Sequence, residues 1–425
     1  MTAVIIGLVV IGFAVIGTPL FVILGGLAML LFAMAGIDIA AVIIEATRIS
    51  TSPVLIAIPL FTFAGYLMAE SDMPKRTINL IKAFLGWMRG GIALVALVAA
   101  TFFTAFTGAT GVTIIALGGL LYPMLKEEKY SEKFTLGMIT TSGSLGLLFP
   151  PSIVIILYGL IAEVNITQLF VAGIIPGAIM VILAAILAMK EGRRVEAAKK
   201  VSGRAMISAV KDAAWEIPLP LVVIGGIYSG MFTAAEAAVI TAAYILIVEV
   251  FIYRDLKLRK DVPRIARSSI VLTGGIFVIL GSALGLTSYL VDEQVPMKML
   301  EWIREHIHSK IVFLLMLNIL LILVGCLMDI FSAIIIIVPL IAPIAEEFGI
   351  HPVHLGIIFL TNLGIGYMTP PVGLSLFISS FRFRKPIVKL YSAVLPFLVV
   401  MLVGLILVTY IPELSLYLLD VFNLS

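Results

Sequence analysis

The chain has little charge and almost no cysteine. Only 12% of its 425 residues are Asp, Glu, Lys or Arg, whereas a soluble domain carries about 25%. The single cysteine, Cys326, excludes an internal disulfide framework and a cysteine-based metal cluster. The formal net charge of +3 is small, so nucleic acid is not expected as a partner. The shortage of charge also excludes an ordinary water-soluble domain.

Hydrophobic residues take the place of the missing charge. They make up 61% of the sequence, and a helix needs roughly 20 apolar residues to cross the hydrocarbon core of a membrane. Charge-free runs of about that size recur at 1–37, 49–69, 90–125, 134–162, 164–189, 217–235, 268–291, 348–381 and 390–412. The sequence therefore predicts an all-α polytopic membrane protein that is surrounded by the lipid bilayer.

Basic residues are concentrated in five short connections. Of the 28 Lys and Arg residues, 24 lie in 75–89, 126–133, 190–211, 254–267 and 382–389. Because Lys and Arg favour loops on the cytoplasmic side, these connections are predicted to be cytoplasmic. The spans between them then place both termini outside, which is the periplasmic face of a bacterial inner membrane.

The run 90–125 is too long for one span, yet basic connections flank both of its ends. It must enter and leave on the cytoplasmic side, either as two full spans or as a re-entrant hairpin. The interior reads FTGATGVT, with Gly108 and Gly111 at its centre. We favour the hairpin, with its tip at these glycines, which let the chain leave helical geometry.

An internal repeat relates the two halves of the chain. Under a shift of 220 positions, TSGSLGLLFPPS matches TNLGIGYMTPPVG, and the paired residues are Gly146 with Gly366, Pro150 with Pro370, and Pro151 with Pro371. The same shift predicts a second hairpin with its tip near Gly325–Ser332. By the charge count the first hairpin opens inward and the second outward, so the repeat is inverted.

The repeat predicts the domain organisation. The first half, 1–215, is expected to hold scaffold helices in 1–89, the hairpin in 90–125, a broken helix in 133–162 and a scaffold or connecting helix in 167–214. The second half, 216–425, is expected to hold scaffold helices in 216–308, the hairpin in 309–346, a broken helix in 352–381 and a final helix in 387–412.

The two Pro-Pro pairs interrupt apolar segments and remove backbone N–H donors. Unwound backbone persists within a membrane only where it lines a protected cavity. Its carbonyl oxygens suit a small cation, and the N-termini of half-helices favour an anion. Interrupted helices in an inverted repeat are typical of the midplane site of a secondary transporter. Two proline kinks without a ligand are the alternative.

Several polar side chains in apolar surroundings have open roles. Asp329, at the second hairpin tip, is a candidate ligand or proton carrier, or else it caps the free N–H groups of the tip. Glu236 is equally open between a functional and a structural role. Glu249 is expected at the membrane interface. His351 and His354 are expected at the external surface, where no transition-metal site is predicted.

The whole chain resembles the large membrane subunit of a tripartite ATP-independent periplasmic (TRAP) transporter of the dicarboxylate and sialic-acid type. The resemblance is carried by FTGATGVT, GSLGLLFPPS, FTAAEAAV, GCLMDIFSA and GYMTPPVG, which follow the order of the family. It implies an elevator-type transporter in which two hairpins and two broken helices move against a scaffold. No nucleophile motif, phosphate-binding loop or paired carboxylates in the sequence indicate an enzyme.

The resemblance also implies partners and site residues. We expect symport with sodium as the coupling ion, no other cofactor, and an organic acid of the sialic acid or C4-dicarboxylate class as the substrate. The expected partners are a small four-helix membrane subunit on a separate chain and a periplasmic substrate-binding protein. Matched by position, the sodium ligands are Thr104, Thr107, Leu145, Leu148, Pro150, Gly325, Gly366, Met368 and Thr369. The substrate contacts are Thr110, Ser142, Ser144, Asp329 and Asn362. A self-sufficient symporter without a binding protein and a polytopic membrane enzyme are the alternatives.

Overall fold

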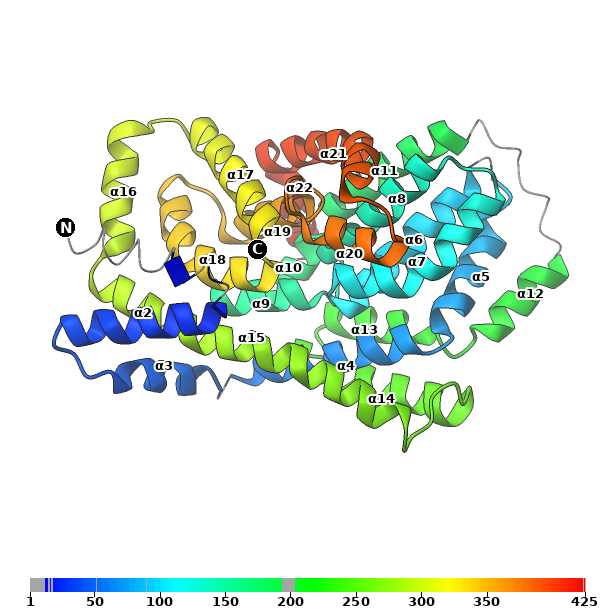
Figure 1. Ribbon diagram of the computed structural model, residues 1–425, viewed down its shortest axis with the longest axis horizontal. Coiled ribbons are helices and arrows are strands. Elements are labelled where there is room, and N and C mark those ends of the chain that lie inside the picture. Colours follow the sequence, from blue (N-terminus) through cyan, green and yellow to red (C-terminus); the bar gives the residue numbers. More distant parts are fainter. Residues whose placement is uncertain are drawn as a thin grey trace.

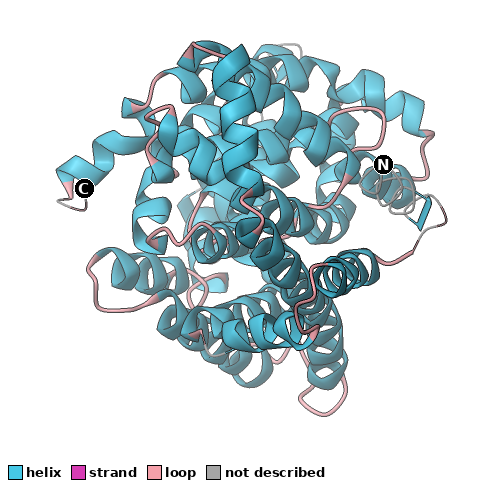
Figure 2. Cartoon of the chain, turned by 90° about the vertical axis from the view of Figure 1, so that its left-hand side faces the viewer, coloured by secondary structure: helices cyan, strands magenta, loops and turns pink. Residues whose placement is uncertain are grey.

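The computed structural model describes residues 12–13, 16, 18–50, 52–88, 90–192, 203–422 and 424. Within these residues every regular element is a helix (Figure 2), so the prediction of an all-α protein is confirmed. Among the described residues, seven helices are long and apolar enough to cross a membrane, or up to eight if one bent pair of helices counts as a single span. The predicted external N-terminus, 1–11, and the basic stretch 193–200 lie outside the described residues.

The helices of the first half are α2 (Leu20–Met34), α3 (Ala40–Ser50), η1 (Pro53–Ile56), α4 (Ala57–Glu70), α5 (Met73–Leu85), α6 (Gly91–Thr107), α7 (Thr110–Glu127), α8 (Glu132–Leu145), η2 (Gly146–Leu148), α9 (Ile153–Ile161), α10 (Ile166–Ala172), α11 (Ile174–Gly192) and α12 (Gly203–Asp212). Those of the second half are α13 (Pro218–Tyr228), α14 (Ala234–Ile247), η3 (Val248–Ile252), α15 (Asp261–Asp292), α16 (Val295–His306), α17 (Lys310–Leu327), α18 (Ile330–Glu347), α19 (Pro352–Gly366), α20 (Leu374–Phe383), α21 (Ile387–Tyr410) and α22 (Glu413–Val421).

The repeat is visible in these bounds. The shift of 220 positions carries the bounds of α7 onto those of α18, and it brings α6, α8 and α9 close to those of α17, α19 and α20. Each half therefore contains a hairpin of two helices followed by a broken helix. The first broken helix bends by 47° between η2 and α9.

The helices pack as two groups (Figure 1). The scaffold group consists of α2, α3, α4, α13, α14 and α15, and the long α15 contacts α2, α3 and α4 while α14 packs along α4. The hairpin group consists of α6–α11 and α17–α22. In this group, α8 contacts the first hairpin and α19 contacts the second hairpin, and both helices also contact α21. One continuous apolar core runs through both groups. Helix α5 connects α4 of the scaffold group to the first hairpin.

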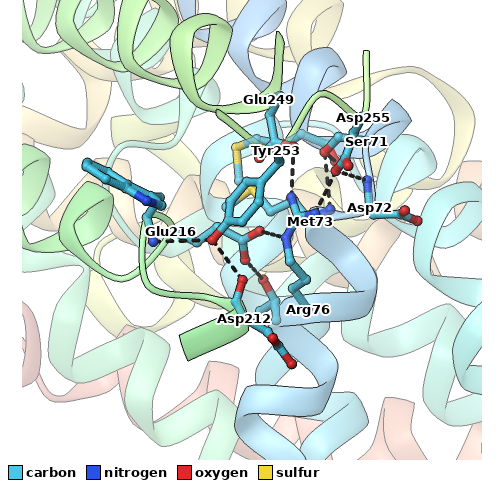
Figure 3. A network of polar contacts seen from close by, with 12 residues as sticks. Ser71, Asp72, Met73, Arg76, Asp212, Glu216, Glu249, Tyr253 and Asp255 are labelled. Carbon is cyan, nitrogen blue, oxygen red and sulfur yellow. Dashed lines mark hydrogen bonds and ion pairs between the residues drawn. The ribbon is translucent and has the colours of Figure 1, made fainter. Parts of the chain in front are cut away.

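The first turn of α5 is held by Arg76 (Figure 3). Its guanidinium pairs with Asp255 at 2.6 Å, with Glu249 at 2.8 Å and with Glu216, and it lies 3.9 Å from the ring centroid of Tyr253. Glu249 is 1% exposed, so it is buried within the protein, and its position at the membrane interface stays a prediction. A carboxylate can be buried there because the guanidinium compensates its charge.

Burial also changes the titration of Glu216. It raises the pKa of this carboxyl to about 7, since the hydrogen bond and charge of Arg76 and a bond from Thr77 offset only part of the lost hydration, and the charge of Glu249 opposes them. The native protein therefore keeps a proton that an unfolded chain releases near pH 4.5. The contribution of this group to stability is complete below that value and falls as the pH rises to about 7.

Raising the pH from about 5 to about 8 should therefore lower the melting temperature of the purified protein. A Glu216→Gln variant should lose this part of the pH dependence, because an amide keeps the hydrogen bonds but does not titrate. Thermal unfolding followed by intrinsic fluorescence in detergent measures the effect, with the exposed Asp420→Asn as the matched control. An unchanged pH slope in Glu216→Gln would contradict the assignment.

Candidate functional site

The tip of the first hairpin gathers threonine hydroxyls. Helix α6 ends at Thr107 and is capped by Gly108, whose φ of 61° lies in the left-handed region, and α7 begins at Thr110. The hydroxyl of Thr104 donates to that of Thr113 at 2.8 Å, and the hydroxyl of Thr107 lies 3.3 Å from the same oxygen. All four threonines are buried. The tip therefore concentrates hard oxygen atoms in the interior, and Thr113 joins the predicted Thr104 and Thr107 there.

The first broken helix supplies carbonyl oxygens next to this tip. In a continuous helix, the carbonyl of Leu147 would accept a hydrogen bond from the N–H of residue 150 or 151. Both residues are prolines and have no N–H, so this carbonyl has no helical donor. The carbonyl of Leu148 loses one such partner, because Ser152 N–H donates to Phe149 instead, at 3.1 Å. The predicted ligands in this stretch are Leu145, Leu148 and Pro150, all of them buried.

A glycine in each broken helix permits direct backbone contact with a hairpin. A Cβ on Gly146 would lie 2.3 Å from the carbonyl oxygen of Thr101 and 2.6 Å from Cβ of Thr104. A Cβ on Gly366, the matched position, would lie 2.7 Å from Cα of Gly325 on α17. The same close approach therefore occurs in both halves of the repeat.

The second break is tied to its hairpin by hydrogen bonds. Gly373 N–H donates to the carbonyl of Cys326 at 3.0 Å, and the Cys326 thiol donates to the carbonyl of Thr369 at 3.1 Å. Tyr367 O accepts from Ser375 N–H at 3.0 Å. The predicted ligands at this junction are Gly325, Gly366, Met368 and Thr369. The sequence pattern did not assign a role to Cys326, whose main chain and side chain both bridge the junction.

At the second hairpin tip, Asp329 caps α18. Its carboxylate accepts from the N–H of Ser332 at 3.0 Å and from the Ser332 hydroxyl, while the hydroxyl of Tyr367 accepts from Ile330 N–H at 2.6 Å. The structural alternative for Asp329 is thus observed, and its role toward substrate or protons stays a prediction. Glu236 likewise forms a capping box at the start of α14.

The predicted substrate contacts on α7 and α8 lie close together. A Cβ on Gly143 would be 3.3 Å from the carbonyl of Thr110, so the two helices touch beside Ser142 and Ser144. The hydroxyl of Ser142 donates to its own helix at 3.2 Å. The buried Ser144 hydroxyl has no hydrogen-bond partner among the described residues. It lines a cavity of about 20 Å³ together with Gly364, its matched position in the repeat.

Asn362 belongs to a different polar network. Its amide donates to Asn318 at 2.7 Å and to its own helix at 2.8 Å, and Asn318 also accepts from Thr409 at 3.3 Å. The ring nitrogens of His354 lie 3.1 Å from the Ser415 hydroxyl and 3.3 Å from the carbonyl of Thr409. His354 is buried, so the prediction that it lies at the surface is wrong. Helix α22 packs against α19 and covers it.

A groove of about 930 Å³ opens between α7 and α20, and its lining consists of Ile115, Phe377, Ile378, Ser380, Phe381, Arg382 and Arg384. Phe377 is 50% exposed and Ile115 is 53% exposed, whereas the matched residues Leu157 and Ile335 are 0% and 1% exposed. Arg382 Nε donates to the carbonyl of Ile115 at 3.1 Å. The surface formed by α7 and α20 is therefore open, whereas the matched surface formed by α18 and α9 is packed.

The glycine contacts lead to a direct test. Gly146→Ala and Gly366→Ala should each lower stability by about 1–3 kcal/mol, because the added methyl groups meet backbone that cannot move away easily. Gly364→Ala is the matched control, since its Cβ would meet no atom closer than 3.6 Å and alanine favours helix by up to about 1 kcal/mol. Thermal unfolding measures all three. Equal melting temperatures would exclude a role for the close approach.

The comparisons with known proteins agree with this architecture. Residues 4–414 match the family described as the DctM component of tripartite ATP-independent periplasmic transporters. The chain is 35% identical over 394 residues to the C4-dicarboxylate TRAP transporter large permease protein DctM of Pseudomonas aeruginosa, which covers 92% of each chain. It is 30% identical over 425 residues to the ectoine TRAP transporter large permease protein TeaC of Halomonas elongata, which covers 99% of this chain and 98% of that one.

Among solved structures, the fold is similar to that of the YdaH transporter of Alcanivorax borkumensis. The TM-score is 0.59 at 14% sequence identity, and the match covers 87% of this chain and 86% of the other. These two relatives are named as transport proteins rather than enzymes. With the family match over nearly the whole length, we conclude that the chain belongs to the large-permease family of TRAP transporters.

Proposed function

We propose that this chain is the membrane carrier of a sodium-coupled importer for a small organic acid anion. The observation that supports sodium most directly is the pair of junctions at Gly146 and Gly366, where an interrupted helix brings its backbone carbonyls against a hairpin helix. Oxygen ligands of this kind suit a small hard cation. Two equivalent junctions favour two ions, one in each half of the repeat.

The proposed substrate is an anion of the C4-dicarboxylate or sialic acid class. The N-termini of α7, α9, α18 and α20 all begin at hairpin tips or breaks, and helix N-termini favour negative charge. A C4-dicarboxylate is the first compound to test because the P. aeruginosa relative is named for it. The relative named for ectoine makes a panel of substrates necessary.

An elevator motion is the proposed mechanism of transport. The hairpin group would move as a unit against the scaffold group, exposing the site to the two faces in turn. In its support, the groove between α7 and α20 is open while the matched surface of α9 and α18 is packed. Such inequality between equivalent surfaces is expected for one end state of an alternating-access cycle.

The proposed partners are a small four-helix membrane subunit on a separate chain and a periplasmic substrate-binding protein. The family description, which names a tripartite and periplasmic system, supports both. A self-sufficient symporter of the same architecture is the second candidate. Omission of the binding protein from a reconstituted system distinguishes the two, because only the self-sufficient symporter would transport without it.

Uptake by the assembled system in proteoliposomes should rise with sodium concentration with a Hill slope above one, as expected for more than one coupling ion. Potential dependence then reports the charge of the substrate, because two sodium ions with a dicarboxylate carry no net charge. With a monovalent anion, each net positive charge gains about 2.3 kcal/mol per 100 mV. Uptake that ignores sodium and follows a proton gradient would refute sodium coupling and leave Asp329 as the candidate proton carrier.

The proposed orientation has both termini in the periplasm of a bacterial inner membrane. Cysteines introduced at the exposed Arg259 and Glu413, in a Cys326→Ser background that keeps a donor to Thr369, should react with impermeant reagents from opposite faces. Arg259→Cys should be labelled from the cytoplasm and Glu413→Cys from the periplasm. Labelling of both positions from one face would refute the orientation.

A further inference from the structure

The Arg76 cluster fastens one end of α5 to three other segments. Glu216 precedes α13, Glu249 lies in the π-helical turn η3 at the end of α14, and Asp255 lies in the connection to α15. The main chain contributes as well, because Asp72 N–H donates to the Asp255 carboxylate at 3.0 Å. The first turn of α5 is therefore fixed to the scaffold group by both side-chain and backbone contacts.

The tyrosine beneath the guanidinium extends the clamp. The hydroxyl of Tyr253 donates to the carbonyl of Asp212 at 2.7 Å and accepts from Trp215 N–H at 3.3 Å, and Tyr244 donates to the carbonyl of Trp215 at 2.7 Å. The connection between α12 and α13 is thus held in the same unit (Figure 3). We call Arg76, Glu216, Glu249, Tyr253 and Asp255 the α5 clamp.

The other end of α5 has the opposite character. Gly86 and Gly90 lie between α5 and α6, and Gly91 is the first residue of α6; we call these three glycines the glycine joint. Gly90 has a φ of +77°, which glycine adopts without strain. A Cβ on Gly192 of α11 would lie 2.3 Å from Cα of Gly90. The glycine joint therefore packs against the hairpin group, while the clamp belongs to the scaffold group.

Among the described residues of the second half, no equivalent clamp is seen at the matched position. The shift of 222 positions that matches Pro74 with Pro296 also matches Arg76 with Lys298 on α16. The side chain of Lys298 is 66% exposed and approaches Glu293 only to 4.0 Å, whereas that of Arg76 is 13% exposed and pairs three times. An exposed pair of that kind contributes little to stability. The two connecting helices are thus held very differently.

We propose that Arg76 is a positioning residue that holds α5 still on the scaffold, so that movement of the first hairpin is taken up at the glycine joint. This inference rests on the proposed transport function. The clamp is placed to set how fast the hairpin group moves, and it touches neither the threonines of the tip nor the broken helices. Its loss should therefore slow transport without changing the affinity for sodium or substrate.

The test compares Arg76→Lys with Arg264→Lys in the assembled transporter. Lysine keeps the charge at position 76 but lacks the planar fork that reaches three carboxylates. Arg264 pairs with Glu70 at 3.1 Å on the surface, so its replacement is the matched control. We expect Arg76→Lys to lower the maximal uptake rate of folded protein at least tenfold, with apparent affinities within about twofold of wild type, and Arg264→Lys to change neither.

Hydrogen exchange provides a readout that does not depend on transport. In the wild type, with and without sodium, amides of residues 73–85 should stay protected while those of 86–91 exchange faster. Arg76→Lys should reduce protection of 73–85 at least tenfold. If Arg76→Lys does not fold, Asp255→Asn, which removes a single ion pair, should show a smaller change in the same direction.

A normal uptake rate per folded molecule in either clamp variant would overturn the proposal, and so would a lower rate accompanied by a parallel loss of sodium affinity. Unchanged protection of 73–85 would overturn it as well. If the wild type shows no sodium-driven uptake, the proposed function fails, and the exchange measurement still decides whether the clamp holds α5.

Discussion

Peptide backbone that leaves helical geometry inside an apolar layer must find polar partners or a ligand, because each unsatisfied group there costs several kcal/mol. In this chain the two broken helices meet the requirement by lying directly against the hairpins. Gly146 and Gly366 make that approach possible, and the hydrogen bonds of Cys326 close the second junction. The arrangement of α6, α8, α17 and α19 follows from these two backbone contacts.

Charge is used sparingly, and the structure shows where it is buried. The hairpin tips contain threonine hydroxyls and one capping carboxylate, Asp329. The other oxygen atoms near the tips are backbone carbonyls of the two broken helices. The densest buried ion-pair cluster among the described residues instead lies where α5 joins the scaffold. A buried cluster of one guanidinium and three carboxylates loses much hydration, and this loss offsets much of the attraction between the charges.

Local signals account for the parts of this fold that the sequence predicts well. Proline pairs and paired glycines change the backbone at their own positions, and the internal repeat places them at matching positions in the two halves. The bounds of α7 and α18 match in the same way. Contacts between segments that are far apart in the chain have no comparable local pattern in the sequence. Glu249 is separated from Arg76 by 173 residues, and His354 is covered by a helix that begins at Glu413. Carbonyl ligands are the hardest to predict, because every residue carries one.

The close contacts at the two glycines have a consequence for how such a sequence drifts. Most of the apolar surface of this chain faces lipid or other apolar side chains, where leucine, isoleucine, valine and methionine exchange at small cost. At Gly146 and Gly366 the neighbouring atoms are mainly backbone, and no change of a partner's side chain creates room for a methyl group. Neutral exchange can therefore replace much of the apolar sequence, while at these two positions no second substitution can compensate for an added side chain.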